Sequence, residues 1–239
     1  MPRGGEERVG NLRPRAKVWA GFRRAGLASG ALATLALGAG SACAAASLTV
    51  MVTRSDGTPV PGAVVLLHGP PGSRPAAPAT YVVDQVNLTF TPDLTVVPVG
   101  SSVKFPNSDA VSHQVYSFSP ARRFQLPLYR GTPYAPVKFD QAGIVTLGCN
   151  IHDDMIAYLV VTDAEWSGLT EADGTWAVAN LPAGEFRVEV WHPRMREVAT
   201  TLEKHLAIAD ATAGKLDVHL MRPLRPEPLG HKPHSWSDY

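Results

Sequence analysis

From residue 46 onward, the chain consists of short apolar runs separated by segments rich in Gly, Pro and Asp. In the first run Leu48, Val50 and Val52 occupy alternate positions, as expected when one face of a β-strand is buried. No stretch keeps a 3.6-residue apolar period for four turns, which argues against amphipathic helices. The pattern predicts an all-β protein with strands at residues 48–52, 63–67, 81–83, 94–97, 102–105, 113–118, 137–139, 144–147 and 156–161.

A second group of strands follows, bounded by its own turn signals. Residues 172–174 and 181–184 have the composition of turns, and strands are predicted at residues 175–178, 186–191 and 215–220. Residues 69–79 contain four prolines and predict a loop between the first strands and the rest. From Arg222 onward the sequence is rich in Pro, His and charge, so we expect a disordered tail.

The beginning of the chain differs from the rest in charge. Residues 1–24 hold seven basic and two acidic side chains, whereas residues 25–53 hold no charged side chain. A basic segment, an apolar Ala- and Gly-rich stretch and small residues at 42–46 predict an export signal peptide, not a transmembrane helix. The pair Arg23-Arg24 partly matches a twin-arginine signal, which leaves both the Sec and the twin-arginine routes open. Gly40 stands where a lipidation motif has Leu, which argues against lipidation of Cys43.

Removal of this leader changes both the charge and the cysteine count. The whole chain has 22 basic and 21 acidic residues, but the part after the leader has 15 and 19, a formal charge of −4, which argues against a nucleic-acid partner. Cys149 is then the single cysteine, which excludes a disulfide scaffold and a four-thiolate metal site. We find no Walker A, dinucleotide or HExxH motif and no catalytic set around His192 or His205, so we expect a protein that is not an enzyme.

The sequence around the single cysteine has the spacing of a metal site. Cys149, His152 and Met155 place a thiolate, an imidazole and a thioether three residues apart, so a loop between two strands can turn all three toward one point. A second imidazole from a neighbouring strand would complete a His₂Cys plane with a weak axial Met, which is the ligand set of a blue-copper electron-transfer centre. Metal ligation would also explain an exported protein with one thiol, because the metal keeps the sulfur deprotonated and protected.

His113 is the best placed second imidazole, because it opens a predicted strand upstream of Cys149. Taken singly, each ligand also has a structural interpretation: Cys149 as a small buried apolar residue, Met155 as core, and either histidine as a core or surface residue. Asp153 and Asp154 suit Cu(I) poorly as ligands and are expected to be solvated. Asn107 and Asn150 are candidates for tying the ligand loops together, with a simple turn role for Asn107 as the alternative, and a backbone N–H near residue 150 or 151 is a candidate donor to the Cys149 sulfur.

The segment from about residue 81 to 162 resembles the cupredoxins of the plastocyanin and amicyanin group. The motif Val103-Lys104-Phe105-Pro106-Asn107 precedes His113, which lies eight residues beyond the Phe, and Gly143 lies six residues before Cys149. The short Cys-x₂-His-x₂-Met loop is most similar to that of amicyanin. The resemblance implies a Greek-key β-sandwich and one type 1 copper bound by His113, Cys149, His152 and Met155. Gly148 departs from the pattern, because plastocyanins have an aromatic residue beside the ligand Cys.

Two further resemblances divide the chain into parts. The motifs Phe-Pro-Asn-Ser-Asp and Leu-Gly-Cys-Asn-Ile-His-Asp resemble the methylamine utilization family of exported cupredoxins, and residues 170–193 resemble the carboxypeptidase-regulatory, transthyretin-like β-sandwich. Residues 52–64 resemble the first hairpin of that second fold, so we expect it to start near Ser47, to be interrupted by the copper domain and to resume near Gly168. The expected parts are a signal peptide (1–46), first strands of the second sandwich (47–69), a copper domain (80–165), a carboxypeptidase-regulatory-like sandwich (166–222) and a tail (223–239).

These features predict an exported, periplasmic type 1 copper protein that carries single electrons between redox proteins, either cytochromes or dehydrogenases, without a transmembrane segment in the mature chain. The alternative is an envelope module in which the second sandwich binds a carbohydrate or protein and the metal site is structural or handles copper. His231 and His234 in the tail are further candidates for adventitious metal capture.

Overall fold

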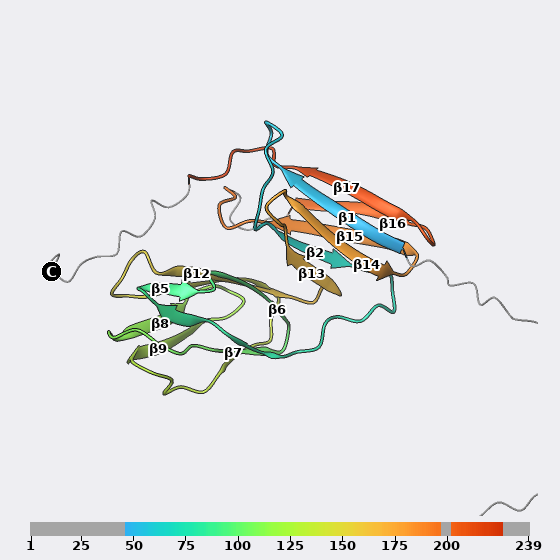
Figure 1. The fold of residues 1–239 in the computed structure, drawn as a ribbon. Helices are drawn as coiled ribbons and strands as arrows, with labels where there is room; N and C mark the ends of the chain where they lie inside the picture. The colour runs from blue at the N-terminus through green and yellow to red at the C-terminus, as the bar shows by residue number, and fades with distance from the viewer. Residues whose placement is uncertain (1–45, 197–201, 227–239) are drawn as a thin grey trace, which may run out of the picture. The chain divides into compact units, whose positions relative to one another are not determined.

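The structure is a computed structural model that describes residues 46–196 and 202–226 (Figure 1). Only β-strands, and no helices, are found in these ranges, which confirms the predicted all-β class. No helix of the described part has the length and apolar character needed to cross a membrane. The predicted signal peptide, except for Ala46, lies outside the described residues, as do Cys43, His231 and His234.

The first two and the last five strands form one set of two sheets, which we call the flanking region. β1 pairs antiparallel with β14 and parallel with β17, and β2 pairs antiparallel with β13 and β15. The first sheet has the order β14 (Thr175–Leu181), β1 (Ala46–Thr53), β17 (Ala213–His219). The second has the order β13 (Trp166–Leu169), β2 (Val64–His68), β15 (Gly184–Trp191), β16 (Leu202–Ile208).

The alternation seen in the sequence explains the core of the flanking region. Leu48, Val50 and Val52 of β1 are fully buried, while Met51 between them is exposed. They share one apolar cluster with residues of β2 and β15, so the two sheets enclose a common core. Each buried aliphatic side chain in such a core stabilises the fold by about 1.5–3 kcal/mol.

The strands between β2 and β13 pair only with one another in the described sheets, and we call residues 80–162 the inserted region. Its largest sheet has the order β6 (Leu94–Pro98), β12 (Ile156–Thr162), β11 (Gly143–Gly148), β8 (His113–Ser117), β9 (Phe124–Tyr129). A second sheet has the order β10 (Val137–Phe139), β7 (Ser101–Lys104), β3 (Thr80–Val82), and β4 (Asp84–Val86) and β5 (Thr89–Thr91) form a hairpin. Residues 69–79 connect the two regions without regular structure, as predicted.

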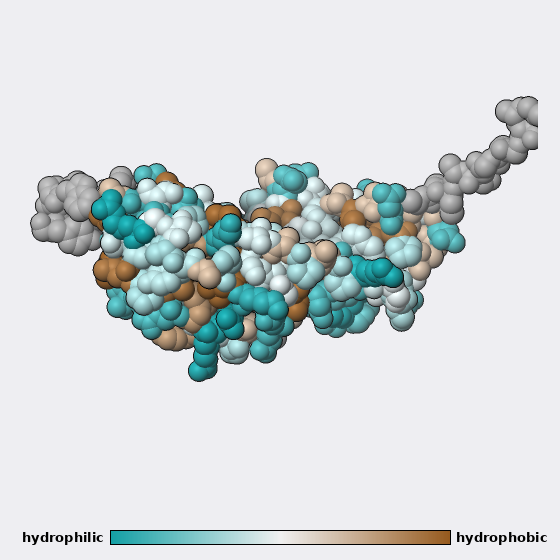
Figure 2. Space-filling view, turned by 90° about the horizontal axis from the view of Figure 1, so that it is seen from below, coloured by the Kyte–Doolittle hydropathy of each residue, from teal (hydrophilic) through white to brown (hydrophobic). Residues whose placement is uncertain are grey.

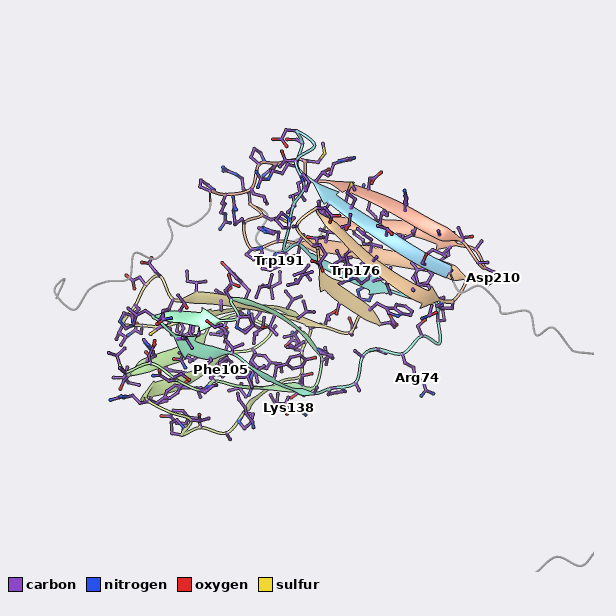
Figure 3. The ribbon with its side chains drawn as sticks, in the orientation of Figure 1. Arg74, Phe105, Lys138, Trp176, Trp191 and Asp210 are labelled. Carbon is purple, nitrogen blue, oxygen red and sulfur yellow. The ribbon has the colours of Figure 1, made fainter. Side chains whose placement is uncertain are left out.

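A separate apolar cluster fills the inserted region. Phe139 and Leu147 are fully buried in it, and Phe105, labelled in Figure 3, stacks on Phe124 with ring centroids 5.7 Å apart. Cys149 and Met155 belong to this same cluster. On the molecular face drawn in Figure 2, by contrast, hydrophobic residues form small patches among hydrophilic ones. The pairing separates the chain into two regions, and their assignment as independent domains, with a transthyretin-like fold for the flanking one, stays a prediction.

Candidate metal centre

Antiparallel pairing of β11 with β12 creates the loop that carries three of the four predicted ligands. Gly148, the last residue of β11, is the register partner of Ile156, the first residue of β12, so residues 149–155 form the connection. Cys149 follows the strand directly, and the backbone N–H of Met155 donates to the carbonyl of His152 at 3.0 Å. The three-residue spacing noted in the sequence is therefore realised as one compact turn.

His113 reaches this loop from the neighbouring strand. β8 runs antiparallel to β11 with Tyr116 opposite Gly148, so the chain before Tyr116 lies beside the chain after Gly148. His113, the first residue of β8, is fully buried, whereas His152 is half-buried. One imidazole is thus fixed inside the protein, and the other lies nearer to solvent.

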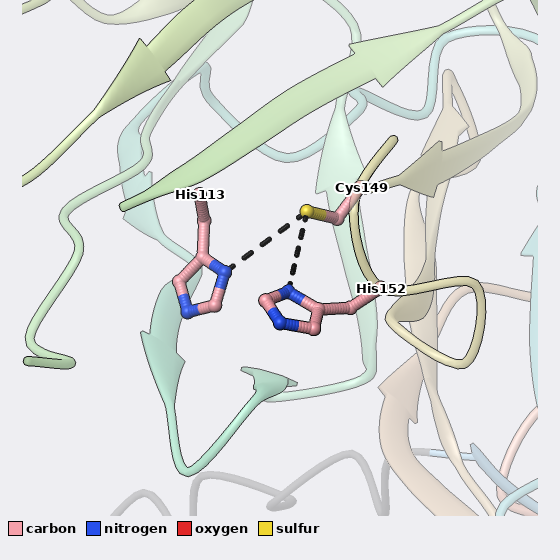
Figure 4. Close-up of side chains that lie close together, drawn as sticks. All are labelled: His113, Cys149 and His152. Atoms are coloured by element: carbon pink, nitrogen blue, oxygen red, sulfur yellow. Dashed lines mark hydrogen bonds between the residues drawn. The ribbon is translucent and has the colours of Figure 1, made fainter. Parts of the chain in front are cut away.

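The two imidazoles and the thiol converge on one point (Figure 4). The Nδ1 atoms of His113 and His152 each lie 4.0 Å from the Sγ atom of Cys149. One ligand atom from each of the three residues lies within 4.8 Å of the others, and this is the single such group of His, Cys, Asp or Glu side chains in the described ranges. The structure therefore brings together His113, Cys149 and His152 of the predicted ligands.

The donor set fits a soft transition metal. Metal–sulfur and metal–nitrogen bonds of about 2.0–2.3 Å allow one ion to bind two donors that lie 4.0 Å apart, at an open angle. A thiolate with two imidazoles suits copper in a trigonal plane, whereas structural zinc sites use four thiolate or imidazole ligands and iron–sulfur clusters use four thiolates as a rule. Cys149 is only 3% exposed, so its sulfur is shielded from bulk water.

The surroundings of Cys149 favour its thiolate. Burial raises the pKa of the thiol, but hydrogen bonds from His113 and from the backbone N–H groups of Gln114 and Ile151, with a smaller one from His152, outweigh burial and lower the pKa of Cys149 to about 6. The donor at Ile151 matches the predicted backbone donor near residue 150 or 151. A thiolate is the form of cysteine that binds a metal.

The outer nitrogen of His113 has a charged partner. Its Nε2 atom lies 2.8 Å from Oδ2 of Asp109. Burial raises the pKa of the Asp109 carboxyl, but hydrogen bonds from the backbone of Leu88, from His113 and from the backbone of Asn87 lower it below its usual value. For His113, burial lowers the pKa, while the contacts with Cys149 and Asp109 raise it above its usual value.

Asn107 braces the loop that leads to His113. Its side-chain amide donates to the carbonyl oxygens of Val111 at 2.9 Å and Tyr129 at 2.8 Å, and its Oδ1 atom accepts from the backbone N–H of Asp109 at 3.0 Å. These bonds join the loop that precedes β8 to strand β9. The sequence had suggested a different connection for Asn107, between the two ligand loops. Asn150, Asp153 and Asp154 are exposed, as expected for the two aspartates.

Met155, the predicted axial ligand, is a buried core residue. It is 1% exposed, packs in the cluster that contains Cys149, and lines with Cys149 a hollow in the surface. The structure thus puts Met155 in the same apolar core as Cys149, and its role as a metal ligand stays a prediction.

Gly148 explains how the site departs from the plastocyanin pattern. A Cβ atom on Gly148 would lie 2.8 Å from Cζ and 2.9 Å from the hydroxyl oxygen of Tyr116. The ring of Tyr116, from the paired strand, therefore occupies the space beside Cys149 that an aromatic neighbour in the sequence would need. Tyr116 in turn contacts Phe118, whose side chain is 72% exposed, with ring centroids 5.1 Å apart.

A different chemistry also uses an acid, an imidazole and a thiol in this order. Asp109, His113 and Cys149 lie in line, as in a thiol nucleophile with its base and orienting acid. One observation favours a metal: His152 approaches the same sulfur, also at 4.0 Å, and has no part in a nucleophile–base–acid set.

Sequence reasoning missed the contacts of Asp109 and Tyr116. The four-residue interval from Asp109 to His113 is a weak signal for the first, and the small Gly148 is one for the second. His205 is exposed and contacts Glu203 at 2.9 Å, and His192 accepts a hydrogen bond from the backbone of Arg194. These two histidines take the structural and surface roles expected of them.

Comparisons with known proteins give similarities to cupredoxin structures. The chain is similar to a purple cupredoxin from Nitrosopumilus maritimus, with 20% identity over 35% of this chain and 99% of that one and a TM-score of 0.31. It is similar to a mutant of amicyanin in its reduced state (22% identity, 41% and 98% coverage, TM-score 0.33) and to a pseudoazurin from Sinorhizobium meliltoi (18%, 36% and 76%, TM-score 0.29). No family model and no curated protein matches the chain. At TM-scores this low, the assignment of the site rests on its geometry alone.

Proposed function

We propose that the protein is a type 1 copper protein that carries single electrons. The observation that supports this most directly is the convergence of two imidazole Nδ1 atoms on one buried cysteine sulfur, each at 4.0 Å. When bound there, copper supplies a centre that accepts and releases one electron by changing between Cu(II) and Cu(I).

The chain's own part in this function is to hold three ligands in one geometry. His113 is fixed at the start of a strand and is fully buried, and Cys149 follows directly on the end of another. Backbone N–H groups of Gln114 and Ile151 hold the sulfur. Ligands fixed in this way move little when the charge at the site changes, and no bond in a substrate is made or broken.

Met155 is proposed as the weak axial ligand. Axial ligands tune the reduction potential of blue-copper centres, so Met155→Gln should lower the potential if the thioether binds copper. If Met155 serves only in the core, the same change should reduce the free energy of unfolding and leave the potential unchanged. Cyclic voltammetry together with urea unfolding separates the two roles.

The proposed setting is an exported one, based on the signal-like leader and on motifs that resemble those of the methylamine utilization family. The partners would be redox proteins of the cytochrome or dehydrogenase type that meet the protein in small, transient interfaces. The half-buried His152 brings one ligand close to the surface, where such a partner can approach.

The decisive experiment is copper loading of the purified protein followed by visible spectroscopy. We expect an intense thiolate-to-Cu(II) absorption band that disappears reversibly on reduction and is absent in Cys149→Ser. A colourless protein that binds Zn(II) or Cu(I) without redox cycling would contradict electron transfer and support the alternative, an envelope binding module with a structural or copper-handling metal site.

A further inference from the structure

Asp109 joins a metal-site histidine to a surface hairpin. Its Oδ2 atom lies 2.8 Å from Nε2 of His113 and accepts the backbone N–H of Leu88 at 2.9 Å. Its Oδ1 atom accepts the backbone N–H of Asn87 at 2.6 Å. Asn87 and Leu88 form the turn between β4 and β5, and both have positive φ angles, 54° and 58°.

The carboxylate of Asp109 is itself held in place. Two backbone donors from the hairpin fix its oxygens, and its own backbone N–H donates to Oδ1 of Asn107, which is 4% exposed. The side chain of Asp109 is only 13% exposed. An acceptor fixed in this position orients the imidazole ring of His113, because the ring can turn only by breaking the bond at Nε2.

This contact also determines which nitrogen of His113 is free. A carboxylate at Nε2 keeps a proton on that atom, so Nδ1, which faces the sulfur of Cys149, is the nitrogen whose lone pair becomes available when a metal replaces its proton. Metal-binding histidines commonly have such a partner on the outer nitrogen, and the partner raises the basicity of the ligand.

We propose that Asp109 is a positioning residue for copper: it fixes the ring and tautomer of His113, and its negative charge favours Cu(II) over Cu(I). This inference rests on the proposed function, since it needs copper to bind at His113. It assigns the β4–β5 hairpin a role as well, because the turn at Asn87 and Leu88 holds the carboxylate in place.

The chain offers a matched control in Asp84. Its carboxylate accepts the hydroxyl of Ser108 at 2.7 Å and the backbone N–H groups of Gln85 at 2.7 Å and Ser108 at 3.2 Å. Asp84 thus braces the loop that contains Asp109 by way of Ser108, one residue earlier, and these bonds bypass the histidines of the site. A role limited to bracing this loop would be shared by both aspartates, whereas a role through His113 belongs to Asp109 alone.

The test uses the full-length protein and measures Cu(II) and Cu(I) affinity by competition with chromophoric chelators, the visible and EPR spectra, and the midpoint potential. Asp109→Ala should weaken Cu(II) binding about 10–100-fold. It should weaken Cu(I) binding less, so the midpoint potential rises. Asp109→Asn, which keeps an acceptor but loses the charge, should preserve the spectra better than Asp109→Ala and still raise the potential. Asp84→Ala, which removes bonds to the loop but none to His113, should change the affinities and the potential less than either Asp109 variant.

Two results would overturn the proposal. One is a Cu(II) affinity and a midpoint potential that equal the wild-type values in both Asp109 variants. The other is an equal change of affinity and potential in Asp84→Ala and Asp109→Ala, because Asp109 would then act only by bracing the loop. If Asp109→Ala does not fold by circular dichroism, the Asp109→Asn potential decides. A wild-type protein without the thiolate band would instead refute the proposed function, so the two failures are distinguishable.

Discussion

The two regions of the protein treat buried polar groups differently. In the flanking region the buried polar side chains of the described residues are two threonines, Thr53 and Thr170. In the inserted region, glutamine, asparagine and histidine side chains are buried as well, among them Gln85, Asn107 and His113. Burying such groups costs free energy unless each is hydrogen-bonded.

This difference shows that the buried polar groups, which cost stability, lie in the region that contains the candidate metal site. The flanking core follows from the alternation of apolar residues and contributes burial alone. The inserted core ends in a polar network in which Asn107, Asp109 and His113 are linked by hydrogen bonds to one another or to neighbouring backbone. Changes of equal size in the two cores should therefore have equal effects on stability and unequal effects on the metal site.

The largest expected effect comes from truncating one phenylalanine in each core. Phe186 in the flanking region is 1% exposed and Phe139 in the inserted region is fully buried, so each change to Ala should cost about 3–5 kcal/mol. Because Phe139 packs in the cluster that holds Cys149 and Met155, only Phe139→Ala should alter the copper spectrum. Urea unfolding of the metal-free protein and visible absorption of the loaded protein measure the two effects. An equal change of the copper spectrum in Phe186→Ala would show that packing in the flanking core also affects the metal site.

Two glycines provide a second comparison, since each has an aromatic ring where a Cβ atom would lie. A Cβ on Gly148 would meet the ring of Tyr116, and one on Gly168 would meet Nε1 of Trp176. Each Gly→Ala change should cost about 1–3 kcal/mol by overpacking. Gly148→Ala should also shift the thiolate band, because its neighbour is Cys149, while Gly168→Ala should not. The double variant Gly148→Ala with Tyr116→Ala should show favourable coupling, and additive losses would contradict a direct clash.

Buried hydrogen-bonding groups allow a third comparison. Thr170 accepts from the backbone N–H of Ala63 and donates to the carbonyl of Val60, so Thr170→Val should leave buried partners unpaired at a cost of about 1–3 kcal/mol. Asn107→Leu should cost a similar amount and in addition lower copper affinity, because it releases the loop that carries Asp109. Chelator competition measures the affinity, and an unchanged value in Asn107→Leu would show that the loop keeps its position without this amide.

The same contrast explains what could be predicted from the sequence. Central strands such as β11 and β12 were predicted because their apolar runs are continuous, and the ligand loop was predicted because its residues lie close together in the chain. Two of the strands that were missed, β9 and β16, lie at sheet edges, where Pro127 and the charges of Glu203 and Lys204 are tolerated but weaken the strand pattern.

Contacts between side chains on different strands could not be predicted from the sequence, for a different reason. The pairing of Tyr116 with Gly148 depends on the register of β8 against β11, which local alternation does not determine. The contact between Asp109 and His113 depends on the course of a loop held by Asn107 and by the β4–β5 turn, and neither of those short strands was predicted.

The smallest expected effect concerns an exposed carboxylate in the flanking region. Oδ1 of Asp173 accepts the backbone N–H of Thr175 at 2.9 Å and its hydroxyl at 2.6 Å, and these bonds lower the pKa of Asp173 below its ordinary value of 3.8. A lowered pKa means that the folded state favours the charged form, so the stabilisation is present above the ordinary pKa and is lost as the pH falls through the folded value. Wild type should therefore melt at a higher temperature than Asp173→Asn at pH 7, with the difference shrinking toward pH 3. Thr175→Ala removes one of the two donors and should show part of this pH dependence, whereas a difference that grows on acidification would contradict the expected sign. Because this turn lies in the flanking region, the copper spectrum should be the same in all three proteins.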